Sequence, residues 1–347
     1  MGKYSVYAPV IMLTMNRFEH FKRCIDSLSR CSGAEYTEVY LGIDYPSKPE
    51  YQEGYEKICK YIDHIHGFKK LHIFKREHNF GATPNNLDLV KRVKEKYDRY
   101  IFSEDDNEFS PNFLEYMNEG LERYKGNNDI IAICGYLLTW NTDFDNCMYT
   151  YNKNIFPAKN FNAVGVGRWF SKESSVSGNL YTKTRVLNST WLTIKTMLYG
   201  YTLTISRYIY QIHRTSEMPD VGRRLYCAFN NKFCIFPTIS KVRNWGYDGS
   251  GLNSDVHPEM IDSVKLDTAE HFVFDDIEIK VYKEVKTLLR QMYNRHPGSG
   301  ITWPGVLKQY IFYKITGKRP SDIKNGKYTL FLIRYILNKL SFGLIKV

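Results

Sequence analysis

Residues 100–117 read YIFSEDDNEFSPNFLEYM, and this stretch decides how the chain folds. Its first four residues, 100–103, predict a buried strand. Ser110 and Pro111 then predict the start of a helix, because serine is a good N-cap and proline fits the first helical position. The helix carries one apolar face, formed by Phe113, Met117, Leu121 and Tyr124. Three acidic residues, 104–106, therefore stand between a strand and a helix.

The acidic cluster Glu104-Asp105-Asp106 is costly unless a positive charge lies nearby. Adjacent carboxylates repel, and each raises the pKa of the other. Oxygen-only ligands suit a hard divalent ion, Mg2+ or Mn2+, which keeps open positions for diphosphate oxygens. The alternative is a solvated acidic turn. Because ligands bind at the carboxyl ends of strands in open α/β sheets, the strand-then-helix setting favours a metal site.

Strands and helices alternate through the first 135 residues. The sequence predicts strands at 7–15, 38–43, 71–74, 100–103 and 130–134, and helices at 19–29 and 51–65. A further helix starts at Thr83-Pro84 and is expected to bury Leu87, Val90, Val93 and Tyr97. This alternation predicts an α/β fold, a mostly parallel sheet flanked by helices and joined by right-handed crossovers. Neither GxGxxG nor GxxxxGK[ST] occurs, which argues against a dinucleotide site or a P-loop.

The composition is that of a folded chain with a sizeable core. Its 347 residues can form one large domain or two smaller ones. Seven cysteines form no CxxC pair, so we expect reduced core thiols in a cytoplasmic protein, without disulfides or a zinc site. Residues 6–13 already predict the first strand, so no signal peptide is expected. No run of 18 uncharged apolar residues occurs, so no membrane span is expected.

Positive charge is concentrated at the C-terminus. Residues 300–347 hold nine Lys or Arg and one acid, a net +8 of the chain's +11. The last twenty residues, 328–347, place five apolar residues on one helical stripe, namely Leu330, Ile333, Leu337, Leu340 and Leu344. A basic amphipathic helix of this kind is typical of one lying on an anionic membrane surface, peripheral on the inner face of the cytoplasmic membrane. Docking on the protein's own core is the alternative; nucleic acid is not favoured, since no binding motif accompanies the charge.

Three segments carry a resemblance to a known family. APVIMLTMNRFEHFKRCIDSL, residues 8–28, resembles the opening of inverting nucleotide-sugar glycosyltransferases of the A-type fold. Residues 101–124 and IAICGY at 131–136 resemble the metal-site region of the N-acetylglucosaminyltransferase I-like group and of bacterial capsule and O-antigen family 2 glycosyltransferases. KVRNWGYDGSGLN, residues 241–253, resembles the C-terminal signature of the bacterial members.

The resemblance implies roles for residues at the strand ends. Asp106 matches the direct metal ligand, with Asp105 a second candidate, while Glu104 and Asp105 would face the ribose and the sugar. The implied nucleotide-sugar contacts are Asp44 for the base, Arg17 for the diphosphate, and Arg76, Asn79 and Gly81 in the segment REHNFGATPN. Each has a structural alternative: a turn-forming Asp before Tyr45-Pro46, a surface arginine that starts a helix, and a plain glycine turn.

An inverting reaction also needs a general base for the acceptor hydroxyl. Asp220, in SEMPDVGRRLYCAF, matches an acid of the family's acceptor half, with a helix N-cap as its structural alternative. Asp248 in GYDGSG is the rival, although it could instead hold the glycine loop by an Asx-turn. Asn253 and Ser254 stand where the family pattern has a histidine, so His257 or His271 is a candidate for a late metal ligand; a lone histidine, however, is more often structural.

The resulting hypothesis divides the chain into three segments. Residues 1–136 would bind the nucleotide sugar, 137–295 the acceptor, and 296–347 would form the basic amphipathic tail. The implied activity is metal-dependent transfer of a hexosyl or N-acetylhexosaminyl group from a UDP-sugar to a glycan or lipid-linked acceptor in bacterial surface polysaccharide synthesis. Two other classes remain: a catalytically inactive carbohydrate-binding relative, and a sugar nucleotidyltransferase. The latter normally has a glycine-rich loop where this chain has TMNRFEH.

Overall fold

A computed structural model gives the structure of the protein and describes residues 4–139, 142–214, 217–251, 256–294, 301–323 and Ile333. The chain forms two compact units. Unit 1 comprises residues 1–140, 149–179 and 226–282, and unit 2 comprises residues 141–148, 180–225 and 283–347. The division of roles among residues 1–136, 137–295 and 296–347 stays a prediction.

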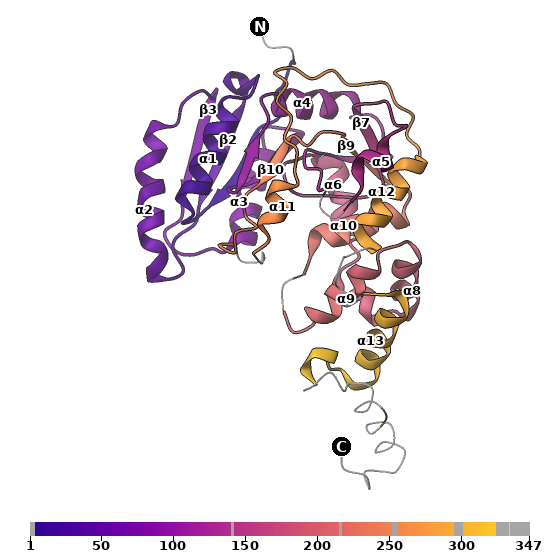
Figure 1. Cartoon of the computed structure of the whole chain (residues 1–347). Coiled ribbons are helices and arrows are strands. Elements are labelled where there is room, and N and C mark those ends of the chain that lie inside the picture. The colour runs from indigo at the N-terminus through magenta and orange to yellow at the C-terminus, as the bar shows by residue number, and fades with distance from the viewer. Residues whose placement is uncertain are drawn as a thin grey trace. The chain divides into compact units, whose positions relative to one another are not determined.

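Unit 1 is built on an eight-stranded sheet (Figure 1) with the order β3-β2-β1-β4-β8-β6-β9-β7. Its strands are β1 (Val10–Thr14), β2 (Glu38–Ile43), β3 (Lys70–Lys75), β4 (Arg99–Glu104), β6 (Ile130–Cys134), β7 (Ile155–Ala158), β8 (Val166–Trp169) and β9 (Phe233–Pro237). Six strands point in one direction, and β7 and β8 run against them. The predicted fold class, a mostly parallel sheet flanked by helices, is confirmed.

The register of the sheet brings three strand ends together. Thr14 lies opposite Ile43 in the β1–β2 pair, and Leu13 lies opposite Glu104 in the β1–β4 pair. Since these strands are parallel, the residues that follow them emerge at one edge of the sheet. Asp44 and Asp105 therefore flank Thr14 at the carboxyl edge.

Helices cover both faces of this sheet. The helices of unit 1's N-terminal part are α1 (Phe18–Ser29), α2 (Gln52–Tyr61), α3 (Ala82–Lys94) and α4 (Phe113–Arg123), with short 3-10 turns at Ala34–Tyr36, Pro49–Tyr51 and Ile62–His64. One apolar cluster joins α1, α2 and α4 to the same sheet face. The α1 residues Phe21, Cys24, Ile25 and Leu28 are all buried, as their helical spacing predicts. In β2, Gly42 faces the other side of the sheet, where a Cβ atom on it would meet Asn85 and Leu89 of α3.

Two predicted helix details are wrong. Helix α3 buries Asn85, Leu89 and Val93, whereas Leu87 is 60% exposed. The buried face is displaced because the Asn85 side chain occupies a core position, where its oxygen accepts from Nε of Arg76 at 3.0 Å. Helix α4 begins at Phe113 with Asn112 as its N-cap, because residues 110–112 form a turn before it. Its apolar face of Phe113, Met117, Leu121 and Tyr124 is buried as predicted.

A small second sheet begins directly after the acidic residues 104–106. Strand β5 (Asn107–Phe109) pairs antiparallel with β10 (Val242–Asn244), so that Asn244 lies opposite Asn107. The remaining helices within unit 1 are α6 (Phe170–Ser177) and α11 (Pro258–Asp262). Helix α10 (Pro219–Phe229) runs from unit 2 into unit 1. The residues directly after Asp106 are thereby tied to a strand far along the chain.

Unit 2 is helical in its described part. Its helices are α5 (Phe144–Met148), α7 (Lys183–Asn188), α8 (Thr190–Leu198), α9 (Thr202–Tyr210), α12 (Lys283–Asn294) and α13 (Trp303–Thr316), and a 3-10 turn follows at Pro320–Asp322. Apart from Ile333, the apolar stripe predicted within 328–347 lies outside the described residues. Among the residues that the structure describes, no helix is long and apolar enough to cross a membrane. All seven cysteines are free thiols.

Candidate active site

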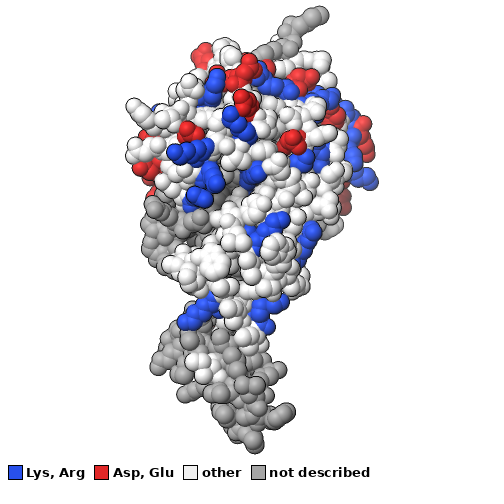
Figure 2. Space-filling view, turned by 90° about the vertical axis from the view of Figure 1, so that its right-hand side faces the viewer, with Lys and Arg blue, Asp and Glu red and all other residues white. Residues whose placement is uncertain are grey.

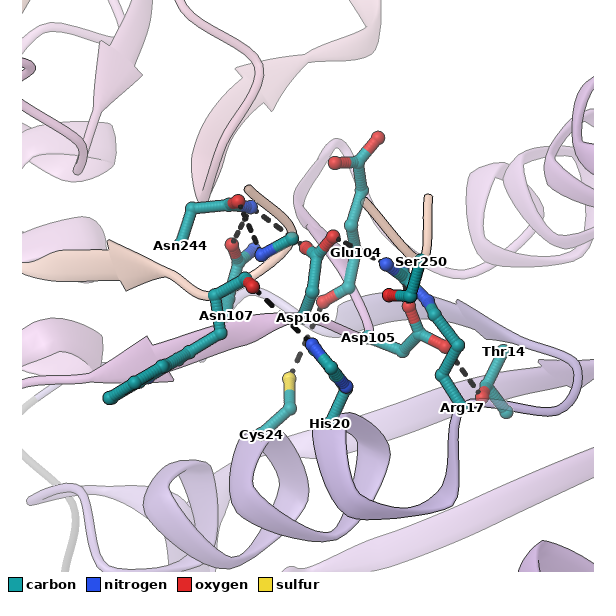
Figure 3. Close-up of polar contacts among 12 residues, drawn as sticks. Thr14, Arg17, His20, Cys24, Glu104, Asp105, Asp106, Asn107, Asn244 and Ser250 are labelled. Atoms are coloured by element: carbon teal, nitrogen blue, oxygen red, sulfur yellow. Dashed lines mark hydrogen bonds and ion pairs between the residues drawn. The ribbon is translucent and has the colours of Figure 1, made fainter. Parts of the chain in front are cut away.

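Two carboxylates at the end of β4 share one arginine (Figure 3). Arg17, at the N-terminus of α1, forms an ion pair with Oδ1 of Asp105 and a second, at 3.0 Å, with Oδ2 of Asp106. The hydroxyl of Thr14, the last residue of β1, donates to Oδ2 of Asp105 at 2.8 Å. Both aspartates are buried, and Arg17 is 19% exposed. The parallel β1–β4 pair thus aligns the acidic residues with the arginine that follows β1.

Asp106 is enclosed by the last residue of β10 and by the segment that follows it. The side-chain amide of Asn244 donates to Oδ1 of Asp106 at 2.8 Å, and the backbone N–H of Trp245 donates to the Asp106 carbonyl oxygen at 2.8 Å. A Cβ atom on Gly246 would lie 2.2 Å from Oδ2 of Asp106, which is closer than real contacts allow. Glycine is required here because the backbone itself packs against the carboxylate.

The charge balance of the pair comes from Arg17. Burial raises the pKa of Asp105 above its ordinary value, as does the negative charge of Asp106, while the guanidinium of Arg17 opposes both effects. The sequence led us to expect a divalent ion beside these carboxylates, whereas the structure places the guanidinium of Arg17 there. Glu104 is exposed, and Figure 3 shows its carboxylate pointing away from Arg17 and Asp106.

The donor set at this edge fits part of a divalent-ion shell. In the described part of the chain, no group of three or more His, Cys, Asp or Glu side chains is arranged to hold a metal. Magnesium-like ions, however, commonly use one or two carboxylates and take their other ligands from water and substrate phosphates. Asp105 and Asp106 offer such a pair, because a carboxylate oxygen that accepts one hydrogen bond keeps a second lone pair. A bound ion would have to share these oxygens with Arg17.

Asp44 holds the loop that precedes α3. Its Oδ1 accepts the backbone N–H groups of Tyr45 at 3.0 Å and Phe80 at 2.8 Å, and its Oδ2 accepts that of Gly81 at 2.8 Å. The side chain of Asn79 donates to the Tyr45 carbonyl at 2.6 Å. Gly81 has a φ of +76°, and a Cβ there would meet no atom within 4 Å. The structure thus joins Asp44, Asn79 and Gly81 through hydrogen bonds of one loop, with open space beside Gly81.

Arg76 turns toward α3. Besides its Asn85 contact, its guanidinium forms a 2.7 Å ion pair with Asp88 and lies 4.8 Å from the centre of the Phe80 ring. Its side chain is 8% exposed. These contacts give Arg76 a position that supports the loop at Phe80, whereas a role toward the diphosphate stays a prediction.

Asp248 lies in the segment that covers Asp106. The backbone N–H of Ser250 donates to its Oδ1 at 2.9 Å and the Ser250 hydroxyl does so at 2.7 Å, which is the Asx-turn considered from the sequence. Its Oδ2 lies 3.1 Å from Nε2 of His20 on α1. Burial alone would raise the pKa of Asp248, but the Ser250 hydrogen bonds and the charge of Arg17 bring it below its ordinary value.

The three remaining predicted site residues, Asp220, His257 and His271, come from segments other than the one that joins β4 to β5 and carries Asp105 and Asp106. Asp220 is exposed in the first turn of α10 and belongs to unit 2, so its role as base stays a prediction. His257 precedes α11 and has its Nδ1 3.0 Å from Glu259. His271 is exposed and lies 3.4 Å from Glu115 of α4. Neither histidine joins Asp105 and Asp106 in a metal-holding group within the described residues.

Several residues of the site were not predicted from the sequence. They are Thr14, His20, Asn244 and Gly246. Thr14 could have been found, because it ends the strand beside the acidic one. Asn244 and Gly246 lie within KVRNWGYDGSGLN, a segment whose resemblance is visible but whose pairing with β5 depends on distant residues. His20 has no local signal beyond its place on the first turns of α1.

Comparison with known proteins gives similarities of low extent. No family model and no curated protein matches the sequence. Solved structures similar to the chain include S. aureus TarS, at 18% identity and a TM-score of 0.26 over 35% of this chain and 20% of that one. A TarS fragment, residues 1–349, has 13% identity and a TM-score of 0.30 over 49% of this chain and 50% of that one.

A mannosyltransferase from Pyrobaculum calidifontis, PcManGT, solved in complex with GDP-Man and Mn2+, is also similar. It has 12% identity and a TM-score of 0.35 over 49% of this chain and 46% of that chain. The aligned region spans half or less of the length of each of these three proteins. Similarities of this size assign no activity, so the function has to be argued from the site.

Proposed function

We propose that the protein is an inverting glycosyltransferase. It would transfer a hexosyl or N-acetylhexosaminyl group from a nucleoside-diphosphate sugar, a UDP-sugar in the first instance, to a glycan or lipid-linked acceptor of bacterial surface polysaccharide synthesis. The observation that carries the proposal is the Asp105–Arg17–Asp106 network at the carboxyl ends of β1 and β4. In open parallel sheets this edge is where nucleotide ligands bind.

The donor would lie between Asp44 and Arg17. Gly81 is the N-cap of α3, and the open space beside it lets a ligand approach the backbone. Asp44 already orders this loop, and its Oδ2, which accepts one hydrogen bond, keeps a lone pair that can accept from a nucleotide base. The Arg17 guanidinium suits diphosphate oxygens, because its planar fork matches their geometry. Glu104 and Asp105 would face the ribose and the sugar.

Asp106 and Asp105 would hold the divalent ion, Mn2+ or Mg2+. When bound, such an ion supplies charge that offsets the negative charge of a departing nucleoside diphosphate. Asn244 and Thr14 keep the two carboxylates in fixed orientations, since each donates to one carboxylate oxygen. The close packing of Gly246 excludes side-chain motion on one side of Asp106.

Asp220 is the proposed general base, with Asp248 as the alternative. A general base works best when its pKa lies near the operating pH. Asp248 is less suited, because its pKa is lowered and both of its oxygens are engaged by Ser250 and His20. Its contacts instead support a structural role in holding the segment 245–250 over Asp106.

The proposal is tested by screening a nucleotide-sugar panel for hydrolysis and transfer, with Mn2+ present and after metal removal. The expected result is turnover of one nucleotide sugar that requires the metal. Binding of a donor without turnover for any acceptor or water would favour a carbohydrate-binding relative. Formation of a nucleotide sugar from a sugar phosphate and a nucleoside triphosphate would instead identify a nucleotidyltransferase.

A further inference from the structure

Helix α8 of unit 2 exposes large apolar side chains to solvent. It buries Thr193, Thr196 and Met197, yet it exposes Trp191 by 66% and Leu198 by 67%. The two exposed residues are seven positions apart, so they lie on one helical face. A surface helix normally presents polar residues to water. The outer face of α8 therefore has the character of a contact surface.

Helix α13 repeats this property. Its inner side buries Val306, Tyr310 and Phe312. Its outer side exposes Ile311 by 44% and Ile315 by 40%, and Trp303 at its first turn is 40% exposed. Ile311 and Ile315 are four positions apart and share one face. Two helices of the same unit thus expose large apolar side chains.

The two helices are fixed to one another within unit 2. The Tyr310 hydroxyl of α13 lies 3.2 Å from the hydroxyl of Thr190, the first residue of α8, and 3.3 Å from the Leu187 carbonyl. We call the exposed apolar residues of these helices the α8–α13 face; its members are Trp191, Leu198, Tyr199, Trp303, Ile311 and Ile315. Large exposed apolar side chains are typical of interaction sites, and here they come from two hydrogen-bonded helices of one unit.

The charge around the α8–α13 face is mainly positive, although Glu217, which accepts hydrogen bonds from Lys183 and Thr184 of α7, adds a negative charge nearby. Segments 180–214 and 301–323 contain nine Lys or Arg, of which Lys183 is buried, and one acid, Asp322. That acid is paired with Arg319 at 2.7 Å. Figure 2 shows the same property: the lower part of the described surface carries blue and white atoms and no red ones. A partner for this face should present negative charge beside an apolar interior.

We propose that the α8–α13 face lies on the surface of an anionic lipid bilayer. Tryptophan and tyrosine suit the boundary between headgroups and acyl chains, because their rings are apolar with one polar atom. Lysine side chains near them can extend to headgroup phosphates while their methylene stems stay in apolar surroundings. Nucleic acid would match the charge but offers no apolar layer for Leu198, Ile311 and Ile315.

This inference does not rest on the proposed reaction. Binding of the protein to lipid requires no sugar donor, no metal and no turnover. It also concerns residues other than the C-terminal stretch 324–347, which stays intact in every variant below. If both hold, the face would bring the enzyme to a lipid-linked acceptor.

The test is co-sedimentation of the full chain with vesicles of phosphatidylglycerol and phosphatidylcholine, against vesicles of phosphatidylcholine alone. Two double variants remove the face, Trp191→Ser with Leu198→Ser and Ile311→Ser with Ile315→Ser. Each should weaken binding to the anionic vesicles at least about tenfold, the value expected for partial withdrawal of two large apolar side chains. The matched control is Leu87→Ser with Val273→Ser, which removes two exposed apolar residues of unit 1 and should bind like the wild type.

Three results would overturn the inference. The first is wild-type protein that fails to bind anionic vesicles at low salt. The second is equal binding by the face variants and the control. The third is a wild-type dimer in solution that the face variants convert to a monomer, since this would make the face an interface between copies. Thermal unfolding midpoints close to that of the wild type show that the variants are folded.

Discussion

At the scale of single residues, Arg17 decides the electrostatics of the site. It pairs with both Asp105 and Asp106, so the two buried carboxylates share one positive charge. A divalent ion would compete with the guanidinium for the same oxygens. A nucleotide diphosphate would relieve this competition, because its oxygens also bind the guanidinium. Metal and nucleotide should therefore bind more tightly together than separately.

Replacing Arg17 tests this competition. Arg17→Gln should strengthen Mn2+ binding in the absence of nucleotide, since the carboxylates lose their competing cation. Titration of free Mn2+ by electron paramagnetic resonance measures the affinity without relying on activity. Arg30→Gln, at the exposed C-terminal end of α1, is the control and should leave the affinity unchanged. Weaker Mn2+ binding by Arg17→Gln would mean that the arginine supports the metal instead of competing with it.

Asp106 should be indispensable for transfer. Asp106→Ala, like metal removal by EDTA, is expected to lower the rate by about 10²-fold or more, the effect of losing one charge-stabilising ligand. Initial rates and circular dichroism would be measured together. Asp63→Ala removes an exposed aspartate and serves as the control. Full turnover after verified metal removal would refute a metal-dependent reaction.

The two candidate bases, Asp220 and Asp248, can be distinguished by the effects of their replacement on donor affinity and transfer rate. Asp220→Asn should leave donor affinity nearly unchanged and reduce transfer by about 10²- to 10⁴-fold, the range for a lost general base. Asp248→Asn should act differently, because it weakens the contacts to Ser250 and His20 that hold the segment over Asp106. It is expected to reduce donor binding as well as rate. If Asp248→Asn alone lowers the rate at constant donor affinity, Asp248 is the base.

At the scale of elements, the junction after β10 controls the geometry of Asp106. Gly246→Ala places a methyl group 2.2 Å from the Asp106 carboxylate, so either the carboxylate or the backbone has to move. Overpacking of this kind costs about 1–3 kcal/mol. We expect a loss of transfer activity larger than the loss of thermal stability. Gly126→Ala is the matched control, because a Cβ there meets no atom within 4 Å.

The elements with a clear local pattern were predictable. Strands β1, β2, β4 and β6 follow apolar runs, and the buried face of α1 follows from its spacing. The buried face of α3 was not predictable, because a polar residue, Asn85, takes a core position, where its side-chain oxygen accepts a hydrogen bond from Arg76. Strand β8 lies antiparallel between β4 and β6, although it follows both in sequence. Such pairing depends on long-range contacts and leaves no periodic signal in β8 itself.

The residues of the site likewise fall into those that could be predicted from the sequence and those that could not. The acidic cluster and Arg17 were predictable, because they follow strands whose apolar patterns are clear. Asn244 was not assigned, since its position depends on the pairing of β10 with β5. Asp44 was predicted as a ligand, and its backbone contacts now add a role in holding the loop at Gly81. A local pattern thus identifies where a site lies, while its enclosure depends on topology.

At the scale of the whole molecule, charge is the main guide to a partner. The C-terminal stretch predicted to bind membrane should add to the α8–α13 face, since each Lys or Arg near an anionic surface contributes about 1 kcal/mol. A chain ending at Gly326 should bind anionic vesicles more weakly than the full chain. The difference should shrink as salt rises, because screening acts beyond about 10 Å at 0.1 M.

Co-sedimentation at several salt concentrations measures this difference. A matched full-length variant, Lys91→Glu, changes an exposed charge of α3 and should bind like the wild type. Equal binding by the shortened and full chains would assign the stretch to the protein's own core. The unfolding midpoint of the shortened chain has to stay near that of the full chain for the comparison to hold.

The enclosure of Asp106 by Asn244 has a consequence for how the protein is made. These two residues are 138 positions apart, so the ribosome releases the acidic cluster long before the strand that covers it. Unit 1 also needs residues up to 282, and contacts of such separation form slowly. A nascent chain would carry Arg17 and both aspartates without the covering segment. The ability to engage a substrate should therefore arise near the end of synthesis, and the half-made sheet is the species that chaperones would have to protect.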